Sequence, residues 1–351
     1  MIFYPSTELI KPIMLKVSVI GASGYTGAQL VDLVHRHPAM DLLGTYVSEN
    51  SADGNKSIAA IHGQYAHLSQ YMLTPMNDST LDTLADTMDL VFLATPHEAS
   101  HDWMAALSKG KAKVLDLSGA FRIKNTEVFE QFYGFKHTSE ACLDKAVYGL
   151  AEWYAKDIAA AKIVAVPGCY PTASLTALKP LLENGLLDSA VRPVINAVSG
   201  VSGAGRKAAL NNSFCEVSLQ AYGVLGHRHT PEIEAWLGTG VIFTPHLGNF
   251  KRGILATITV KLKPGVSAEQ LSSAYHTAYE GKPVVRIRDT FPKIDDVVNT
   301  PFVDLYWKLD AQSGYAVITS AIDNTMKGAA SQAMQCANLV SGLPDAQGLI
   351  A

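Results

Sequence analysis

Cys169 is the residue whose type and setting best suit covalent chemistry. It stands in VPGCYPTASLTAL (166–178), between a Pro-Gly turn and apolar residues at helical spacing. Unpaired amides at a helix start stabilise a thiolate, which is the nucleophilic form of cysteine. We therefore predict that Cys169 is a nucleophile, against the alternative of an inert core thiol. The other cysteines lack this setting and are interpreted as structural: Cys142, Cys215 and Cys336.

A thiolate can form a thioester with an activated acyl group or a thiohemiacetal with an aldehyde, while a nicotinamide cofactor exchanges hydride with the same carbon. This chemistry needs a group that moves protons. GHRHTPEIEAWL (226–237) offers His227 and His229 just before a helix predicted to have Thr230 as N-cap and Pro231 as first residue. Either imidazole suits the role. The alternatives are a surface turn and, more weakly, a metal site.

Two loops hold arginines that suit anion recognition. LDLSGAFR (115–122) places Ser118 and Arg122 after a predicted strand, and SGVSGAGRKA (199–208) joins a glycine-rich turn to Arg206. The planar fork of arginine fits a carboxylate or a phosphate. We predict that these three side chains bind a small dianionic acyl phosphate or its aldehyde. The alternative is that the arginines are ordinary surface charges.

A glycine-rich turn follows the first apolar run. KVSVIGASGYTGAQLVDLVHRHP (16–38) is typical of a strand, a turn and a helix, with Gly21, Gly24 and Gly27 in the turn. Backbone amides and the helix dipole hold a pyrophosphate at such a place. The spacing differs from G-x-G-x-x-G, and the alternative is a turn that merely needs glycine. Its position in the first strand-helix unit favours dinucleotide binding.

The end of the second predicted strand bears on the choice of cofactor. NAD sites usually place an acid there for the ribose hydroxyls, whereas this strand ends TYVSEN with Ser48 at that position. The nearest acid is Glu49, and Lys56 follows. A 2′-phosphate would meet a hydroxyl instead of repulsion, so we predict NADP. A shift of a residue in the alignment would bring Glu49 into the place of the acid.

His97-Glu98-Ala99-Ser100-His101 matches the zinc-binding pattern H-E-x-x-H. Pro96 indicates the first turn of a crossover helix, and no third ligand follows at the spacing of the zinc enzymes. We therefore expect no metal centre. In this interpretation Thr95, Pro96 and His97 line the crevice at the end of a strand, and His101 lies on the helix surface.

The elements that must position these residues fall into two groups. Apolar runs at 16–20, 40–48, 89–96 and 113–119, with helical patterns between them, predict a parallel sheet covered by helices. A second, sheet-dominated group follows, and the helical pattern of 323–340 is expected to return to the first. The predicted strands of the second group are 191–200, 241–248, 253–262, 283–287 and 315–322.

We therefore predict an α/β fold with a doubly wound, Rossmann-type NADP domain over 14–165 plus 327–351. An α+β, sheet-dominated catalytic and oligomerisation domain is predicted over 166–326. Residues 1–13 are expected to be an extension outside the fold. They lack the basic start and cleavage site of a signal peptide.

Composition limits the partners. The 351 residues include 28 basic and 32 acidic side chains, a net charge of −4, with no basic block suited to nucleic acid. No apolar run has the length of a membrane span. Four widely spaced cysteines fit reduced thiols, so we expect a cytoplasmic protein. The apolar strands of the second domain predict a homo-oligomer, a dimer or a tetramer.

Several segments together resemble the N-acetyl-gamma-glutamyl-phosphate reductases, a family of the aspartate-semialdehyde dehydrogenase superfamily. The resemblance covers about 14–351, and PGCYPT and HRHTPEI are its most specific parts. The other matching segments are GASGYTG, LDLSGAFR, YGLAEW, SGVSGAGR and DNTMKGAA.

The resemblance implies NADPH-dependent reduction of N-acetyl-L-glutamyl 5-phosphate to N-acetyl-L-glutamate 5-semialdehyde with release of phosphate, in arginine biosynthesis. It implies Cys169 as nucleophile and a histidine of HRH as acid–base, with His227 favoured over His229. The predicted cofactor-binding residues are Gly21, Ser23, Gly24, Tyr25, Thr26, Gly27, Ser48, Thr95, Pro96 and Gly203, and the resemblance adds Asn324.

Three other functions are considered. One is an aspartate-semialdehyde dehydrogenase-type reductase that acts on another acyl phosphate. The second is a dinucleotide-binding redox sensor in which Cys169 is oxidised. The third is a zinc hydrolase built on the H-E-x-x-H segment.

Overall fold

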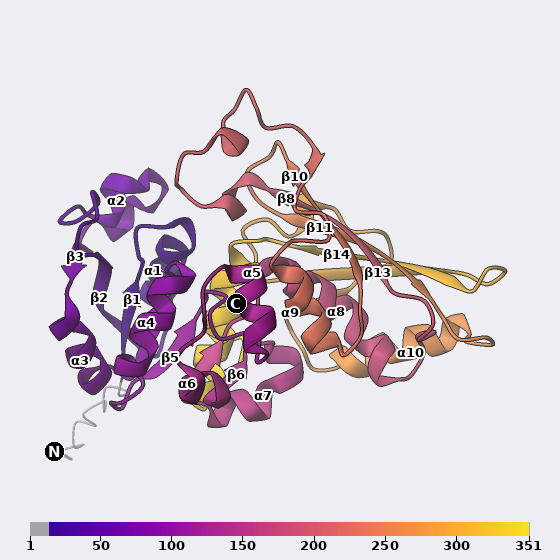
Figure 1. The fold of residues 1–351 in the computed structure, drawn as a ribbon, viewed down its shortest axis with the longest axis horizontal. Helices are drawn as coiled ribbons and strands as arrows, with labels where there is room; N and C mark the ends of the chain where they lie inside the picture. The colour runs from indigo at the N-terminus through magenta and orange to yellow at the C-terminus, as the bar shows by residue number, and fades with distance from the viewer. Residues whose placement is uncertain (1–13, 351) are drawn as a thin grey trace, which may run out of the picture.

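The computed structural model describes residues 14–350, which form two seven-stranded sheets with helices packed on them (Figure 1). The predicted extension 1–13 lies outside the described residues. Both sheets and their helices agree with the predicted fold class, which is confirmed. No helix within 14–350 is long and apolar enough to cross a membrane.

The first sheet is parallel throughout, in the order β3-β2-β1-β4-β5-β7-β6. Its central strands are short apolar runs that are buried on both faces, as helices on both sides require. The strands are β1 (Leu15–Ile20), β2 (Met40–Ser48), β3 (Leu73–Met76), β4 (Leu90–Leu93), β5 (Lys113–Asp116), β6 (Ala146–Tyr148) and β7 (Ile163–Ala165).

The helices of the first unit connect these strands. They are α1 (Tyr25–Arg36), α2 (Ile58–Ile61), α3 (Asp78–Thr87), α4 (His97–Leu107), α5 (Thr126–Tyr133), α6 (Glu140–Lys145) and α7 (Ala151–Ala160), with the 3₁₀ turn η1 (Gly63–Leu68). The end of the chain returns as a π-helical turn, η5 (Met326–Ala330), followed by α11 (Ser331–Val340). Helix α11 packs on α1, α7 and β5, as expected for 323–340.

The second sheet is mixed, in the order β12-β13-β14-β11-β8-β10-β9. Its strands are β8 (Val194–Gly200), β9 (Gln220–Ala221), β10 (Ile242–Gly248), β11 (Ile254–Lys261), β12 (Val285–Ile287), β13 (Val303–Asp310) and β14 (Tyr315–Ile322). Helices α8 (Cys169–Glu183), α9 (His229–Leu237) and α10 (Ala268–Tyr279) share one apolar core with the buried side chains of this sheet. A long connection, 201–228, links β8 to α9 and includes the 3₁₀ turns η2 (Val201–Ala204) and η3 (Leu210–Asn212). A further 3₁₀ turn is η4 (Ile294–Asp296).

The two faces of the second sheet differ. Ile195, Ala256 and Ile258 point to the helices and are fully buried. On the other face Thr257 pairs in register with Asn196, and both are exposed although they lie in central strands. This face, which includes Asn196 and Thr257, is called the open face below. Strands β8, β11, β14 and β13 at the middle of this sheet pair antiparallel, and antiparallel strands tolerate one uncovered face, whereas the parallel strands of the first sheet do not.

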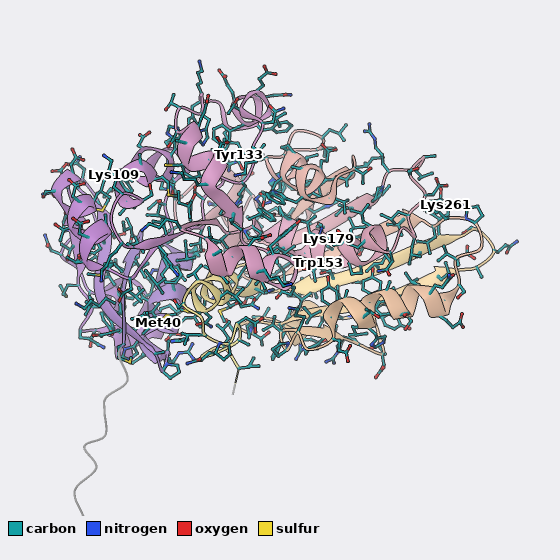
Figure 2. The ribbon with its side chains drawn as sticks, turned by 90° about the horizontal axis from the view of Figure 1, so that it is seen from below. Met40, Lys109, Tyr133, Trp153, Lys179 and Lys261 are labelled. Atoms are coloured by element: carbon teal, nitrogen blue, oxygen red, sulfur yellow. The ribbon has the colours of Figure 1, made fainter. Side chains whose placement is uncertain are left out.

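The two units are joined through helices α7 and α8. Lys179 of α8 places its Nζ 4.9 Å from the centre of the Trp153 ring of α7, and Figure 2 shows the two labelled side by side. The indole of Trp153 donates a hydrogen bond to the hydroxyl of Tyr279 in α10. The predicted boundaries between the domains, at 165/166 and 326/327, stay a prediction.

Candidate active site

The carboxyl ends of four parallel strands gather the predicted residues. The glycine turn follows β1, Thr95 and Pro96 follow β4, Ser118 follows β5, and Cys169 comes shortly after β7. Parallel strands end at one edge of their sheet, which is where ligands bind in open α/β folds. The order of the strands therefore brings segments 150 residues apart in the chain to one crevice.

Cys169 is the first residue of α8. Gly168 is the N-cap, no side chain caps the helix, and no acidic residue lies in its first turn. The amides of Cys169 and Tyr170 and the charge of Arg122 lower the pKa of the thiol, but burial outweighs them and raises it to about 11. The expectation that this setting favours the thiolate is therefore wrong for the free chain, because desolvation exceeds the effect of the helix start.

Gly328 in η5 lies against Cys169. A Cβ added to Gly328 would stand 2.7 Å from the Cβ of Cys169, too close for any side chain. The π-helical turn holds this glycine through a hydrogen bond from its amide to the Asp323 carbonyl oxygen, 2.9 Å. The C-terminal segment therefore forms one wall beside the thiol.

The two histidines of HRH lie together, with ring centres 4.8 Å apart. His227 Nδ1 accepts a hydrogen bond from the His229 amide at 3.1 Å, so neutral His227 carries its proton on Nε2. Burial lowers the pKa of His227 to about 4 and holds that of His229 well below its usual value, with Arg228 adding to both shifts. Both imidazoles are therefore neutral at pH 7.

His229 lies against Gly168, the residue before Cys169. A Cβ on Gly168 would meet His229 Nε2 at 2.4 Å and Arg122 Nη1 at 2.9 Å. Its Nδ1 is buried and has no hydrogen-bond partner in 14–350. Tyr170, next to Cys169, stacks edge-on against both imidazoles, at 5.7 and 5.8 Å. The residues on both sides of Cys169 therefore lie against the histidines, Gly168 against His229 and Tyr170 against both rings.

Glu232 links these parts and is a residue that sequence reasoning missed. Its carboxylate is fully buried in α9 and accepts hydrogen bonds from the Tyr148 hydroxyl, the Gly168 amide and Arg122 Nη1, at 2.8, 2.9 and 3.2 Å. A buried charge is stable only with such partners. The sequence signal for its burial was that Glu232, in the first turn of the helix, stands between the apolar residues Pro231 and Ile233.

Arg122 and Ser118 are engaged by the protein itself. Arg122 Nε donates to the Val166 carbonyl oxygen and Nη2 to that of Leu117, both at 2.7 Å, besides the pair with Glu232. Ser118 Oγ donates to the Asp116 carboxylate at 2.9 Å. These contacts fix the loops after β5 and β7. The substrate-binding role of the two residues stays a prediction.

The glycine turn fits a dinucleotide pyrophosphate. Gly21 has φ +83°, and a Cβ there would lie 2.2 Å from the Ala94 carbonyl oxygen; at Gly27 it would lie 2.1 Å from the Gly21 oxygen. Helix α1 has no side-chain cap and no acid in its first turn. Its first amides are thus free to face an anion, and the residues present suit the predicted cofactor.

Asn324 and the turn at Gly203 meet at the junction of the units. Asn324 Oδ1 accepts from the Gly253 amide at 2.7 Å, and its Nδ2 donates to Ser202 Oγ at 2.9 Å. A Cβ on Gly203 would lie 3.6 Å from the same Nδ2. Gly203 and Asn324, two predicted cofactor residues that lie 121 positions apart in the chain, are therefore neighbours.

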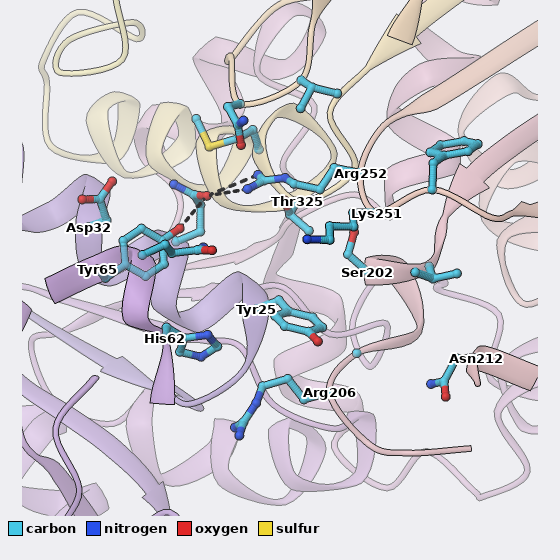
Figure 3. Close-up of a pocket in the computed structure, with 18 of the residues that line it drawn as sticks. Tyr25, Asp32, His62, Tyr65, Ser202, Arg206, Asn212, Lys251, Arg252 and Thr325 are labelled. Carbon is cyan, nitrogen blue, oxygen red and sulfur yellow. Dashed lines mark hydrogen bonds between the residues drawn. The ribbon is translucent and has the colours of Figure 1, made fainter. Parts of the chain in front are cut away.

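A cavity of about 1360 Å³ adjoins this junction, between α1, η1, the 201–212 turns and η5. Figure 3 shows Tyr25, His62 and Arg206 on one side of it and Arg252 and Thr325 on another. Arg206 Nη1 donates to the Ser23 carbonyl oxygen and to Asp53. Arg206 thus contacts the glycine turn instead of the thiol, and its predicted substrate role is untested.

The histidines of the H-E-x-x-H segment have separate partners. His97 Nδ1 accepts from the Gly119 amide at 2.8 Å. His101 Nδ1 contacts Asp102, and its Nε2 accepts from the Thr138 amide. His101 is only 7% exposed, so its expected place on the helix surface is wrong: Phe121 and His137 cover it.

The fold is similar to that of solved aspartate-semialdehyde dehydrogenases. The Vibrio cholerae structure complexed with ASA has a TM-score of 0.69 at 17% identity, covering 94% of this chain and 98% of that one. The Candida albicans structure with NADP has a TM-score of 0.62 at 14% identity, covering 96% of this chain and 100% of that one. At such identities the likeness concerns the fold alone.

Sequence comparison identifies the family. Residues 16–161 match the model of the semialdehyde dehydrogenase NAD binding domain, and residues 169–324 match that of the semialdehyde dehydrogenase dimerisation domain. N-acetyl-gamma-glutamyl-phosphate reductases from Alteromonas mediterranea and Pseudoalteromonas atlantica are 70% and 62% identical over 96% of this chain, and over 100% and 98% of their own lengths. The resemblance is thus confirmed, and the chain belongs to the N-acetyl-gamma-glutamyl-phosphate reductase family.

Proposed function

We propose that this protein reduces N-acetyl-L-glutamyl 5-phosphate to N-acetyl-L-glutamate 5-semialdehyde, with NADPH as reductant and release of phosphate. The observation that supports this most is the position of Cys169 at an uncapped helix start, in the crevice that also holds the glycine turn, with its neighbours Gly168 and Tyr170 against the two neutral imidazoles. The acyl phosphate and NADPH would meet in this crevice. The names of the relatives supply the acyl group.

In the first step the Cys169 sulfur bonds to the acyl carbon, and the bond from that carbon to the phosphate oxygen breaks. Because the thiol has a pKa of about 11, its proton must be taken up as the sulfur attacks. His229 suits this role, since it is neutral and its Nε2 stands beside Gly168. The Nε2 proton of His227 suits a hydrogen bond to the carbonyl oxygen.

When bound, NADPH would supply the hydride that reduces the thioester carbon, and the oxygen on that carbon would take up a proton to give a thiohemiacetal. The carbon–sulfur bond then breaks, the hydroxyl loses its proton, and the sulfur regains one as the aldehyde leaves. The residues for the cofactor are those of the glycine turn, with Ser48, Thr95, Pro96, Gly203 and Asn324. Glu232 is a positioning residue that holds Arg122 and the Gly168 amide.

We further propose that copies of this chain associate as dimers or tetramers through 169–324. The description of the matching family model as a dimerisation domain and the open face of the second sheet support this. Free thiols at all four cysteines support a cytoplasmic location.

The reaction is tested in reverse, with phosphate, NADP and either N-acetylglutamate semialdehyde or aspartate semialdehyde. We expect phosphate-dependent NADPH formation with the first aldehyde and at least about 100-fold less kcat/KM with the second. Preference for aspartate semialdehyde would overturn the substrate assignment.

A Cys169→Ser variant tests the nucleophile in the same assay. We expect kcat to fall at least about 10³-fold, because the serine hydroxyl has no base strong enough to form the acyl enzyme. Cys142→Ser is the matched control and should keep its activity, since this cysteine lies away from the crevice. Normal turnover by Cys169→Ser would exclude the thioester route.

A further inference from the structure

Arg206 reaches from the connection after β8 to the dinucleotide-binding unit. Its Nη1 donates to the Ser23 carbonyl oxygen at 2.8 Å and to Asp53 Oδ2 at 2.7 Å. The side chains of Arg206 and Asp53 are 32% and 21% exposed, so solvent screens the pair only in part. Figure 3 shows Arg206 extending beneath His62 and Tyr25 at the edge of the cavity.

Asp53 follows the carboxyl end of β2 (Met40–Ser48), which is the region where Rossmann-type folds hold the adenosine ribose of a dinucleotide. The chain turns at the carboxyl end of β2, with the Ser51 amide on the Ser48 carbonyl oxygen and the Asp53 amide on Ser51 Oγ. An acid at this end of the second strand accepts the ribose 2′-hydroxyl of NAD and repels the 2′-phosphate of NADP. Taken alone, Asp53 would favour the wrong cofactor for the function proposed above.

The ion pair removes this conflict. The hydrogen bond from Arg206 is the main cause that lowers the pKa of Asp53, so the carboxylate is charged and its charge is met by the guanidinium. Lys56 also faces Asp53, but at 3.7 Å and with a side chain 52% exposed. Within 14–350, Nε and Nη2 of Arg206 have no hydrogen-bond partner, so they are free to donate to a phosphate.

We propose that Arg206 is a specificity-determining residue for the cofactor: it neutralises Asp53 and thereby lets the site accept the 2′-phosphate of NADP. The proposal rests on the dinucleotide site of the proposed function. It makes cofactor choice depend on a side chain from the second unit, which reaches the site only when the 201–206 turns lie against the glycine turn.

The test is equilibrium titration of the full chain with NADPH and with NADH, followed by cofactor fluorescence, without acyl substrate. Arg206→Ala is expected to raise the Kd for NADPH about tenfold and that for NADH less than about twofold, since only the former has the extra phosphate. Adding Asp53→Asn to Arg206→Ala should recover most of the NADPH affinity. Lys207→Ala, the neighbouring cation of the same cavity, is the matched control and should bind both cofactors normally.

Equal weakening of both cofactors by Arg206→Ala would mean that Arg206 only holds the loop, and would overturn the proposal. An unchanged Kd for NADPH, or no recovery in the double variant, would overturn it too. Circular dichroism confirms that each variant is folded. Failure of the proposed reaction would be seen separately, as wild-type protein that binds NADPH but forms none from either aldehyde.

Discussion

At the scale of single residues, the Cys169 thiol is protonated in the resting protein because burial opposes the effect of the helix start. Its pKa of about 11 lies above the usual value, so the thiolate fraction should rise about tenfold per pH unit below that value. We expect the rate of alkylation of Cys169 by iodoacetamide to rise steadily from pH 7 to 10 without a plateau. Peptide mass spectrometry of timed samples measures this rate.

The exposed thiol of Cys215 is removed by Cys215→Ser so that it does not compete for the reagent. A plateau in the alkylation rate below pH 8 would show that the thiolate already predominates at neutral pH. In that case the helix-start amides, and not an imidazole, would activate the sulfur. This result would contradict the proposal that His229 takes up the thiol proton.

At the scale of elements, the turn η5 holds Gly328 against Cys169, and a buried ion pair between Lys327 and Glu152 holds the turn. Lys327 is fully buried, and its Nζ lies 2.6 Å from Glu152 Oε1 in α7 and 2.5 Å from Gln335 Oε1 in α11. The C-terminal segment is thus tied to the first unit one residue before it meets Cys169.

Lys327→Met should lower the free energy of unfolding by roughly 3–5 kcal/mol, because the Glu152 carboxylate would stay buried without its cation. Urea unfolding followed by tryptophan fluorescence measures this loss. The double variant Lys327→Met with Glu152→Gln should recover part of the loss, since no charge is then left unpaired. Lys207→Met changes an exposed lysine and should stay within about 0.5 kcal/mol of wild type. Equal stability of Lys327→Met and wild type would contradict the stabilising role.

The elements that could be predicted best from the sequence are those that depend on residues close together in the chain. The glycine turn and the start of α8 depend on neighbouring residues, so their positions follow from short motifs. Strand β13 was not predicted, although the apolar residues Val303, Leu305 and Trp307 recur at every second position, which is the spacing of a strand. The buried Glu232 network and the pair of Arg206 with Asp53 join residues far apart in the chain, so no local pattern could predict the partners.

At the scale of the whole molecule, the open face of the second sheet exposes Asn196 and Thr257 within 14–350, whereas Thr319 on the same face is buried. Thr257 lies at its centre, between Asn196 of β8 and Thr319 of β14. A sheet face with exposed polar and β-branched residues suits contact with the same face of a second copy, and in a twofold dimer a residue near the axis lies beside its own copy. The proposed association therefore places Thr257 near the centre of the contact.

Thr257→Arg should separate the copies, because it buries two like charges where two uncharged side chains met. We expect the mass measured by light scattering at micromolar concentration to fall toward that of one chain, 37.6 kDa. Gln312→Arg, in the exposed turn between β13 and β14, is the matched control and should leave the mass unchanged. A wild-type protein that already has the mass of one chain would contradict the proposed oligomer. An oligomer of unchanged mass in Thr257→Arg would show that the copies do not meet through the open face.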